Sequence, residues 1–548
     1  MFLRALVLTA VGLGVTVLPA VPASAHAGLV SSTPEAGSVL GQSPEQITLT
    51  FNETVSAVPG RIQVVAPDGK RITESVAVRG NVLTIRVRRA DQALGTYLVS
   101  YRMVSGDSHP IGNALIFSVG APSARPAEAD PSKVHPTVTA AVSTFKFLGY
   151  AGLTLIVGPT LFLALLWPRR MSRRGPIRLV RAGLALTVVA TMGTLWSQAP
   201  YGSGAPLWDV SLPELSDVLA SRFGITLTAR LAVLALIAGL ITPVLRGTSG
   251  WVRTIPLLGL GAAGLTTWPL TGHAVVSPLA GALVAADVVH MAAMAVWLGG
   301  LVTLSAFLLR RANSRVLRVI LPVWSRWATL AVVWLVSAGV VQSVVQVGSV
   351  PALWQTGYGQ LLLAKVAVLA TVLATAAFAR KLVQRHQVSS QGPAQLRRTV
   401  GVEIAATTAI LAMSAVLVQV TPGRSAETRK TPPVEDGVSQ TLTSKLYTLQ
   451  FNIYPVELGE WNTVHGQTYT PEGKPLPAKE WTVTTRHVGQ DLEPVTEPIA
   501  PLPARNDALG SLTFPLPGTY EITFTIRTTE LDQATVKTTV TVPATPQK

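Results

Sequence analysis

The 548-residue chain contains no cysteine, and only 13% of its residues are charged. The missing cysteine excludes disulfides, thiolate zinc sites and thiol redox chemistry. A soft metal would therefore have to be bound by histidine, methionine, carboxylates or the chain terminus. Soluble proteins carry roughly 25% charged residues. The low charged fraction, together with 48% hydrophobic residues, indicates a membrane protein.

Acidic residues are scarce, since 28 Asp and Glu stand against 44 Lys and Arg and leave a formal net charge of +16. Nucleic-acid binding would require basic runs beside aromatic or groove-reading elements. The arginines instead lie in short loops between long apolar stretches, a pattern that sets membrane topology. We therefore expect no nucleic-acid partner. The sequence also has no G-x-x-x-x-G-K-[ST] loop, so it gives no sign of direct drive by ATP.

The first residues of the chain have the pattern of an export signal. A charged start is followed by an apolar run from Ala5 to Leu18 and by the sequence Ala23-Ser-Ala. These are the n-region, h-region and cleavage site of a secretory signal peptide. The alternative is an uncleaved first span, but the run is short and interrupted by prolines. We expect residues 1–25 to be removed, which leaves His26 as the mature N-terminus.

Two segments alternate apolar and polar residues with a period of two, which is typical of β-strands. We expect a β-sandwich of Ig-like or Greek-key type at residues 26–120 and a second β-sandwich at 446–548, with linkers at 121–138 and 423–445. The expected strands are 47–51, 61–65, 82–87, 97–101 and 114–119 in the first domain, and 446–451, 481–485, 520–526 and 536–542 in the second.

Residues 139–422 contain long apolar runs separated by short loops. Eight runs of roughly 20 residues are long enough to cross a bilayer as helices. They lie at 142–167, 178–198, 224–245, 252–271, 280–308, 324–347, 358–379 and 400–420. Arginine and lysine concentrate in every second loop, as the positive-inside rule requires of cytoplasmic loops. We expect a multi-domain protein of the cytoplasmic membrane with an eight-helix multi-pass bundle and with both β domains extracytoplasmic.

Two of these runs resemble each other. Residues 223–234 align with residues 358–369, and each segment carries one cation, Arg230 or Lys365, about two turns into its span. Repeated four-span halves would suit a transporter with its site between them. The alternatives are chance similarity of two Leu/Ala-rich helices and cations that reach to the outer headgroups.

Three residues of the first β domain form a candidate metal site. Asp107 and His109 lie two positions apart, so in an extended backbone both side chains point to the same face. An N-terminal His26 would add an amine and an imidazole in one chelate ring. The resulting set of three nitrogens and one oxygen suits tetragonal Cu(II). The alternative is that His26 is an accident of cleavage and that Asp107 and His109 only shape a turn.

A second group of candidate ligands lies within the fifth apolar run. Asp287, His290, Met291 and Met294 share one helical face by their spacing. His290 would lie about 15 Å into its span. Ionisable residues at that depth usually serve function, although a structural Asp287–His290 hydrogen bond between helices is the alternative. His273 ends the fourth run at the outer face, where it could receive an ion.

The first β domain resembles the CopC family of copper-binding periplasmic domains. The resemblance lies in residues 26–34, 48–53 and 104–112. It implies that His26, Asp107 and His109 bind Cu(II). Ser108 replaces the glycine that is usual in the family, which we expect to matter little. The Met-rich Cu(I) site of some members is missing, since only Met103 is present, and this implies a single Cu(II) site.

The later segments resemble two further families. Residues 271–273 and 287–301 resemble the CopD family, and residues 462–465 and 471–475 resemble the YtkA-like β-sandwich that is often fused to such proteins. The CopD resemblance implies a membrane copper path that includes His273, Asp287, His290 and Met294, where Met294 suits Cu(I).

These observations predict a non-enzymatic protein that binds copper outside the membrane and transports it across, for copper uptake, homeostasis or resistance. The expected partners are copper ions, the lipid bilayer and an extracytoplasmic copper chaperone or acceptor protein. One alternative is a membrane-anchored protein that sequesters or senses Cu(II) without transport. Another is a copper-dependent oxidase-type enzyme that uses the N-terminal His, but a carboxylate ligand from Asp107 would close its open coordination position. Transport direction, energy source and oligomeric state are left open.

Overall fold

The computed structural model describes residues 27–40, 43–88, 95–119, 126, 131–248, 250–277, 279–385, 392–424, 437–454, 456–459, 461–471, 473–490, 492–502 and 506–544. Contacts divide the chain into two units. One holds the helices of Lys133–Lys430 together with the short segment Val104–Pro110, and the other holds the remainder of both β domains. The predicted signal peptide, His26 and His386 lie outside the described residues.

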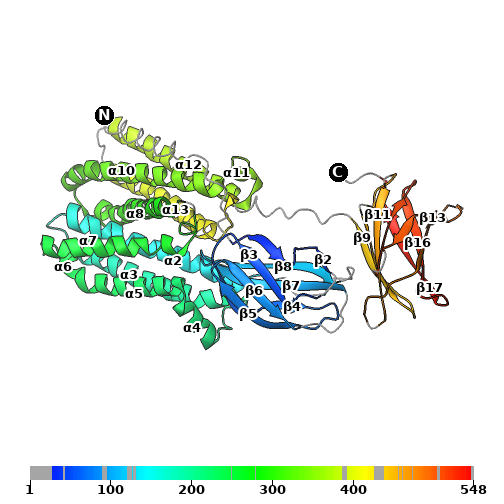
Figure 1. Cartoon of the computed structure of the whole chain (residues 1–548). Helices are drawn as coiled ribbons and strands as arrows, with labels where there is room; N and C mark the ends of the chain where they lie inside the picture. The colour runs from blue at the N-terminus through cyan, green and yellow to red at the C-terminus, as the bar shows by residue number, and fades with distance from the viewer. Residues whose placement is uncertain are drawn as a thin grey trace. The chain divides into compact units, whose positions relative to one another are not determined.

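The N-terminal β domain consists of two four-stranded sheets (Figure 1). The first sheet has the order β1 (Leu29–Thr33), β3 (Gln46–Phe51), β6 (Val82–Val87) and β5 (Thr73–Arg79). The second has the order β2 (Val39–Leu40), β8 (Pro110–Val119), β7 (Gly95–Ser105) and β4 (Val55–Val65). Phe51 of β3 and Tyr101 of β7 meet edge to face with 5.6 Å between ring centroids, so the two sheets pack on one core. All the strands expected for this domain are present, while its Ig-like or Greek-key type stays a prediction.

The C-terminal β domain also consists of two antiparallel sheets that enclose one core. One sheet has the order β14 (Ile499–Pro501), β15 (Asp507–Thr513), β11 (Trp461–Tyr469), β10 (Thr448–Tyr454) and β9 (Val438–Thr443). The other has the order β13 (Val495–Glu497), β12 (Glu480–His487), β16 (Gly518–Arg527) and β17 (Gln533–Val542). Phe451 and Phe524, from different sheets, meet in this core with 4.7 Å between their ring centroids. The expected strands are found, and β9 lies entirely within the predicted linker at 423–445.

The helical unit contains long helices that pack side by side (Figure 1). Its elements in chain order are α2 (Pro136–Leu161), η1 (Phe162–Leu166), α3 (Arg174–Ser203), α4 (Leu212–Ala220), α5 (Arg222–Leu240), α6 (Thr242–Arg246), α7 (Trp251–Thr266), η2 (Pro269–Thr271), α8 (Ala280–Thr303), η3 (Leu304–Leu308), α9 (Leu309–Arg311), α10 (Ser314–Val347), α11 (Ala352–Gln355), α12 (Gly357–Arg385) and α13 (Gly392–Leu417). The helix α2 begins inside the predicted linker at 121–138.

Seven helical segments are long and apolar enough to cross a membrane in the part of the chain that the structure describes. The predicted fourth run, 252–271, differs from the others because it forms α7 of only 16 residues, followed by the short 3-10 helix η2. At 1.5 Å per residue, α7 spans about 24 Å, which is less than a hydrocarbon core of ~30 Å. The count of eight spans therefore stays a prediction, whereas a multi-pass helical membrane region is present.

Glycines let α2 and α8 approach closely, as small residues do at helix interfaces in membranes. A Cβ atom on Gly299 of α8 would overlap the backbone oxygen of Thr154 on α2, and one on Gly158 of α2 would overlap the backbone of Gly299. A Cβ on Gly300 would overlap the ring of Trp324 on α10. This packing fixes the position of α8, the helix that carries Asp287, His290 and Met294.

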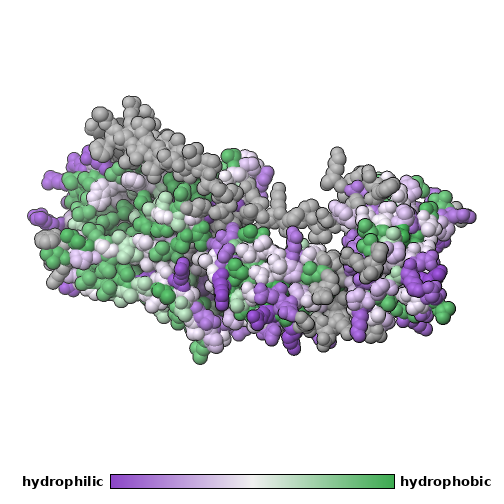
Figure 2. Space-filling view, in the orientation of Figure 1, coloured by the Kyte–Doolittle hydropathy of each residue, from purple (hydrophilic) through white to green (hydrophobic). Residues whose placement is uncertain are grey.

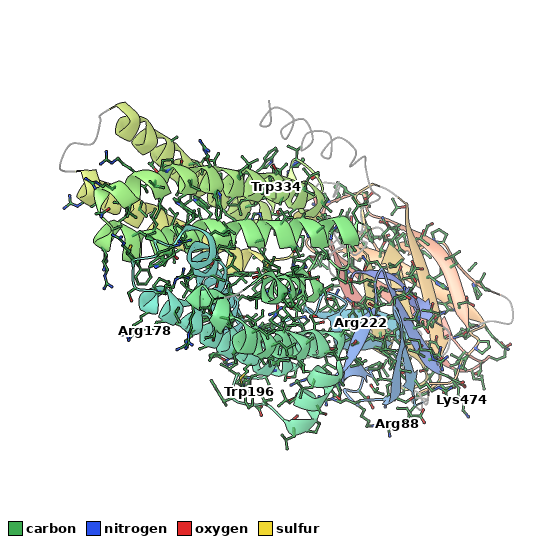
Figure 3. All side chains as sticks on the ribbon, turned by 90° about the vertical axis from the view of Figure 1, so that its left-hand side faces the viewer. Arg88, Arg178, Trp196, Arg222, Trp334 and Lys474 are labelled. Carbon is green, nitrogen blue, oxygen red and sulfur yellow. The ribbon has the colours of Figure 1, made fainter. Side chains whose placement is uncertain are left out.

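The outer surface of the helical unit is largely hydrophobic in the face shown by Figure 2. Large apolar side chains on this surface are not covered by other parts of the protein, as is expected of residues that face lipid. Trp196 and Trp334, which are labelled in Figure 3, are 45% and 48% exposed. Such a surface fits contact with acyl chains and agrees with the low charged fraction of the sequence.

Candidate metal centre and membrane cavity

The hairpin turn between β7 and β8 brings Asp107 and His109 together. The Ser105 amide donates to the His109 carbonyl at 2.9 Å, and the Ser108 amide donates to the Ser105 carbonyl at 2.9 Å. The Asp107 carboxylate accepts hydrogen bonds from the Ser105 hydroxyl and from the His109 amide, the latter at 3.1 Å. We expected the two side chains to meet along an extended strand. A tight turn brings them together instead, and both are buried, with exposed fractions of 1% and 4%.

Ser108 has a backbone conformation that favours glycine. Its φ is 72°, in the left-handed region where a Cβ atom is strained. The expectation that serine here matters little for metal binding stays a prediction, whereas the backbone at this position favours glycine. The strain is held by hydrogen bonds on both sides, because the Ser108 amide is bonded within the turn and its carbonyl accepts from Gln198 Nε2 at 2.8 Å.

His273 lies at the same cluster, although it is 164 positions from His109 in the chain. Its Nδ1 is 2.8 Å from Asp107 Oδ2, and its ring stacks on that of His109 with 4.7 Å between centroids and 16° between planes. One ligand atom from each of Asp107, His109 and His273 falls within 4.8 Å of the others. The sequence placed His273 at the outer face as a separate candidate, and no spacing signal linked it to Asp107.

The C-terminal end of α3 contacts this turn. Gln198 of α3 donates to Ser108, and the Tyr201 ring meets the His109 ring edge-on with 6.2 Å between centroids. The Tyr201 hydroxyl is 3.4 Å from Gln419 Oε1, just after α13. Gln198 and Tyr201 were missed by the sequence analysis, because an amide and a phenol at a helix end have no distinguishing pattern.

The donor set of this cluster is two imidazoles and one carboxylate. Nitrogen and oxygen donors of this kind suit Cu(II) and other borderline divalent ions rather than Ca²⁺ or Mg²⁺, which prefer oxygen ligands. The Asp107 carboxylate contacts both imidazoles, since His109 Nδ1 is 3.3 Å from its Oδ1. The predicted amine and imidazole of His26 lie outside the described residues, so the full chelate stays a prediction.

A cavity of about 190 Å³ lies within the helical unit. Its lining includes His273 from the segment after η2 and Asp287, His290, Met291 and Met294 from α8. The helical stripe expected from the spacing is thus present, and its side chains share one cavity. Because His273 belongs both to this lining and to the cluster with Asp107, the cavity and the cluster are adjacent.

The side chains of the stripe are held by neighbouring helices. His290 Nδ1 donates to the Leu335 carbonyl of α10 at 2.9 Å, which leaves Nε2 as the nitrogen with a free lone pair. This hydrogen bond goes to α10 rather than to Asp287, in contrast to the structural alternative considered above. The Thr154 hydroxyl of α2 donates to Met294 Sδ at 3.3 Å. The hydrogen bond to Leu335 therefore fixes the tautomer of His290, and the one from Thr154 fixes the position of the Met294 thioether.

The two cations of the similar segments line this same cavity. Arg230 is buried, donates to the hydroxyl and carbonyl of Thr267 at 2.8 and 2.9 Å, and lies 4.1 Å from the centroid of Trp268. The alternative that Arg230 reaches to the headgroups is therefore wrong. Lys365 also lines the cavity. Two helices of similar sequence thus contribute to one cavity, which agrees with a repeat that surrounds a central site.

The remaining histidines and Met192 have other surroundings. His135 caps the N-terminus of α2 by accepting from the Thr137 amide, which gives it a structural role. Met192 is 58% exposed and is absent from the cavity lining among the described residues. The His465 side chain is 44% exposed beside Asp507 on the surface of the C-terminal β domain.

Three family comparisons cover most of the chain. The CopC domain family matches residues 29–120, the copper resistance protein D-like N-terminal domain family matches 137–281, and the copper resistance protein D family matches 318–417. None of these three matches extends into the C-terminal β domain, so its YtkA-like assignment stays a prediction.

Individual copper-related proteins are also similar to this chain. Copper transport protein CutJ of Bacillus subtilis (strain 168) is 25% identical over 409 residues, which cover 72% of this chain and 73% of that protein. Copper resistance protein C of Pseudomonas syringae pv. tomato is 36% identical over 105 residues, or 18% of this chain and 82% of that protein. The solved CopC of Methylosinus trichosporium OB3b is 27% identical, covering 17% of this chain and 93% of that chain at a TM-score of 0.16. CutJ and copper resistance protein C are copper transport and copper resistance proteins rather than enzymes. The chain therefore belongs to the CopC/CopD family of copper resistance and transport proteins, and it is a multi-pass membrane protein.

Proposed function

We propose that this protein binds copper outside the cytoplasmic membrane and passes it into the helical cavity for transport. Asp107, His109 and His273, together with the mature N-terminal His26, are the proposed outer ligands. The observation that carries the proposal is the position of His273. Its Nδ1 lies 2.8 Å from Asp107, and the same residue lines the cavity that holds the α8 stripe.

The outer cluster is the proposed Cu(II) site. Its imidazole nitrogens and carboxylate oxygen, with the amine of His26, give the nitrogen-rich set that Cu(II) prefers. Because His273 touches the carboxylate that would bind the metal, copper can change ligands there without first entering water. We propose that His273 exchanges with His26 as the ion moves inward.

The α8 stripe is the proposed inner path. His290 presents Nε2, since its Nδ1–H is bonded to Leu335, and Met294 adds a thioether one turn further along the helix. A thioether favours Cu(I) over Cu(II), so the proposed inner path takes copper that an external one-electron donor has reduced before entry. Asp287 would orient His290 or neutralise the ion, one turn nearer the outer site.

The orientation proposed for the protein follows the arginine-rich loops. Arg173 lies between η1 and α3, and Arg310 and Arg311 belong to the short helix α9 after η3. Following the positive-inside rule, we propose that both connections lie in the cytoplasm. Val104–Pro110 and the residues after η2 belong to the opposite ends of these helices by chain order. Both β domains are then extracytoplasmic.

Uptake of radioactive copper into membrane vesicles of both orientations tests the proposal. We expect wild type to move copper in one orientation, and His273→Ala and His290→Ala to abolish that movement at matched protein abundance. Met192→Ala is the matched control, because it removes an exposed thioether that does not line the cavity. If His290→Ala moves copper as wild type does, the inner path is wrong. If wild type binds copper but moves none in either orientation, anchored sequestration replaces transport.

A further inference from the structure

Basic side chains outnumber acidic ones in the described lining of the membrane cavity, which is unexpected for a path that carries a bare cation. Lys146 of α2, Arg230 of α5 and Lys365 of α12 line it, while Asp287 is the acidic residue among its described lining. Like charges repel a copper ion strongly where water is scarce and the local dielectric is low. Three basic side chains against one carboxylate therefore favour a negatively charged occupant.

Two glutamine side chains of α10 add hydrogen-bonding groups to this lining. Gln342 and Gln346 are one turn apart and both border the cavity. Gln342 Nε2 and Gln346 Oε1 are buried and have no hydrogen-bond partner among the described residues, and Gln346 is only 9% exposed. A buried amide without a partner is costly, so a ligand or water is needed there. Rotation of either amide can present an N–H group to an anion.

The cations come from equivalent positions of the two similar segments. Arg230 and Lys365 align with each other, as do Phe223 and Tyr358, and all four residues line the same cavity. The hydrogen bonds of Arg230 to Thr267 use Nε and one Nη2 hydrogen, so guanidinium donors remain for a ligand. Each of the two similar segments thus contributes a basic side chain to the cavity from the same aligned position.

We propose that this cavity contains a binding site for a small halide, chloride in the cell, held by Arg230, Lys365 and Lys146 and by the amides of Gln342 and Gln346. The volume of about 190 Å³ admits several water-sized groups but no extended organic anion beside a metal ion. The halide offsets the basic side chains, and because chloride also coordinates Cu(I), it can share a Cu(I) ion with Met291 and Met294. The part of this inference that concerns copper rests on the proposed function, whereas halide binding does not.

Binding of radioactive chloride to the full-length protein in detergent, without copper, tests the site directly. We expect saturable binding to wild type, weakened at least about tenfold by Lys365→Met and by Arg230→Met. Arg222→Met is the matched control, since Arg222 is an exposed cation at the start of the same helix as Arg230 and is not among the described residues that line the cavity. Gln346→Leu should weaken binding less than either charge removal. Cu(II) binding to each variant reports that the protein is folded.

The outcomes separate this inference from the proposed function. Absence of saturable chloride binding in wild type, or equal binding by wild type and Lys365→Met, would overturn the halide site. Copper uptake by vesicles is then compared in chloride and in methanesulfonate at the same free copper concentration. Slower uptake in methanesulfonate is the expected result, and equal uptake would overturn the role of the halide in copper passage. If wild type binds chloride but moves no copper in either medium, transport fails while the halide site stands.

Discussion

The outer cluster and the α8 stripe are two groups of metal-binding side chains that are assembled in different ways. Asp107 and His109 belong to a hairpin turn and His273 to a segment far along the chain, and the three meet within 4.8 Å. Asp287, His290 and Met294 follow one another on a single helix. The outer cluster therefore depends on the packing of a turn against helices. The common face of the stripe depends on helix α8 alone, while α2 and α10 fix the orientation of its side chains. Substitutions should separate the two groups.

The largest effect is expected from Asp107→Ala. Its carboxylate contacts both His109 and His273, so its loss removes one proposed ligand and releases two others. We expect Cu(II) affinity to fall by about 100-fold or more in a competition titration. Asp209→Ala, which removes an exposed carboxylate, is the control. Unchanged affinity in Asp107→Ala would show that the turn does not bind copper.

A residue added before His26 should have the next largest effect. It destroys the chelate between the terminal amine and its imidazole, while the other three outer residues stay in place. We expect Cu(II) affinity to fall by about tenfold or more, measured on protein whose N-terminus is verified by mass spectrometry. Equal affinity of the extended and native termini would leave Asp107, His109 and His273 as the complete site.

Asp287→Asn tests the α8 stripe while leaving the outer cluster intact. An asparagine keeps a polar group beside His290 but removes the negative charge from a cavity that also holds Lys146, Arg230 and Lys365. We expect copper uptake by vesicles to fall several-fold, less than in His290→Ala, with Cu(II) affinity of the outer cluster unchanged. A parallel loss of outer affinity would mean that the two groups act as one site.

The smallest effect is expected from Ser108→Gly. Glycine adopts the left-handed conformation of this residue without a Cβ clash, so it should stabilise the turn by up to about 1 kcal/mol. The melting temperature should rise slightly, and Cu(II) binding should be kept. Ser216→Gly in the middle of the exposed helix α4 is a control of opposite sign, because glycine destabilises a helix interior by a similar amount. A lower melting temperature in Ser108→Gly would show that the serine side chain stabilises the turn.

The sequence shows the glycines that allow α2 and α8 to pack closely, but it does not show which residues they pack against. The residues Gly299 and Gly300 could be read as small residues in an apolar run, but their partners could not. A Cβ at Gly299 would meet Thr154 and one at Gly300 would meet Trp324, on two other helices. The pairing of helices depends on shape complementarity between surfaces distant in the chain, and periodicity carries no information on it.

The sequence by itself determined what depends on local periodicity and on charge. Alternation predicted the strands of both β domains, apolar length predicted the spans, and the spacing of Asp287, His290 and Met294 predicted their common face, because these patterns arise from the geometry of single elements. Only the tertiary structure decided that His273 joins Asp107, that Arg230 is buried over Trp268, and that both similar segments surround one cavity. It also showed that the fourth apolar run forms a helix of only 16 residues, ended by the turn that carries His273 to the cluster. Such contacts join residues far apart in the chain, and they form only where whole helices and turns pack against one another.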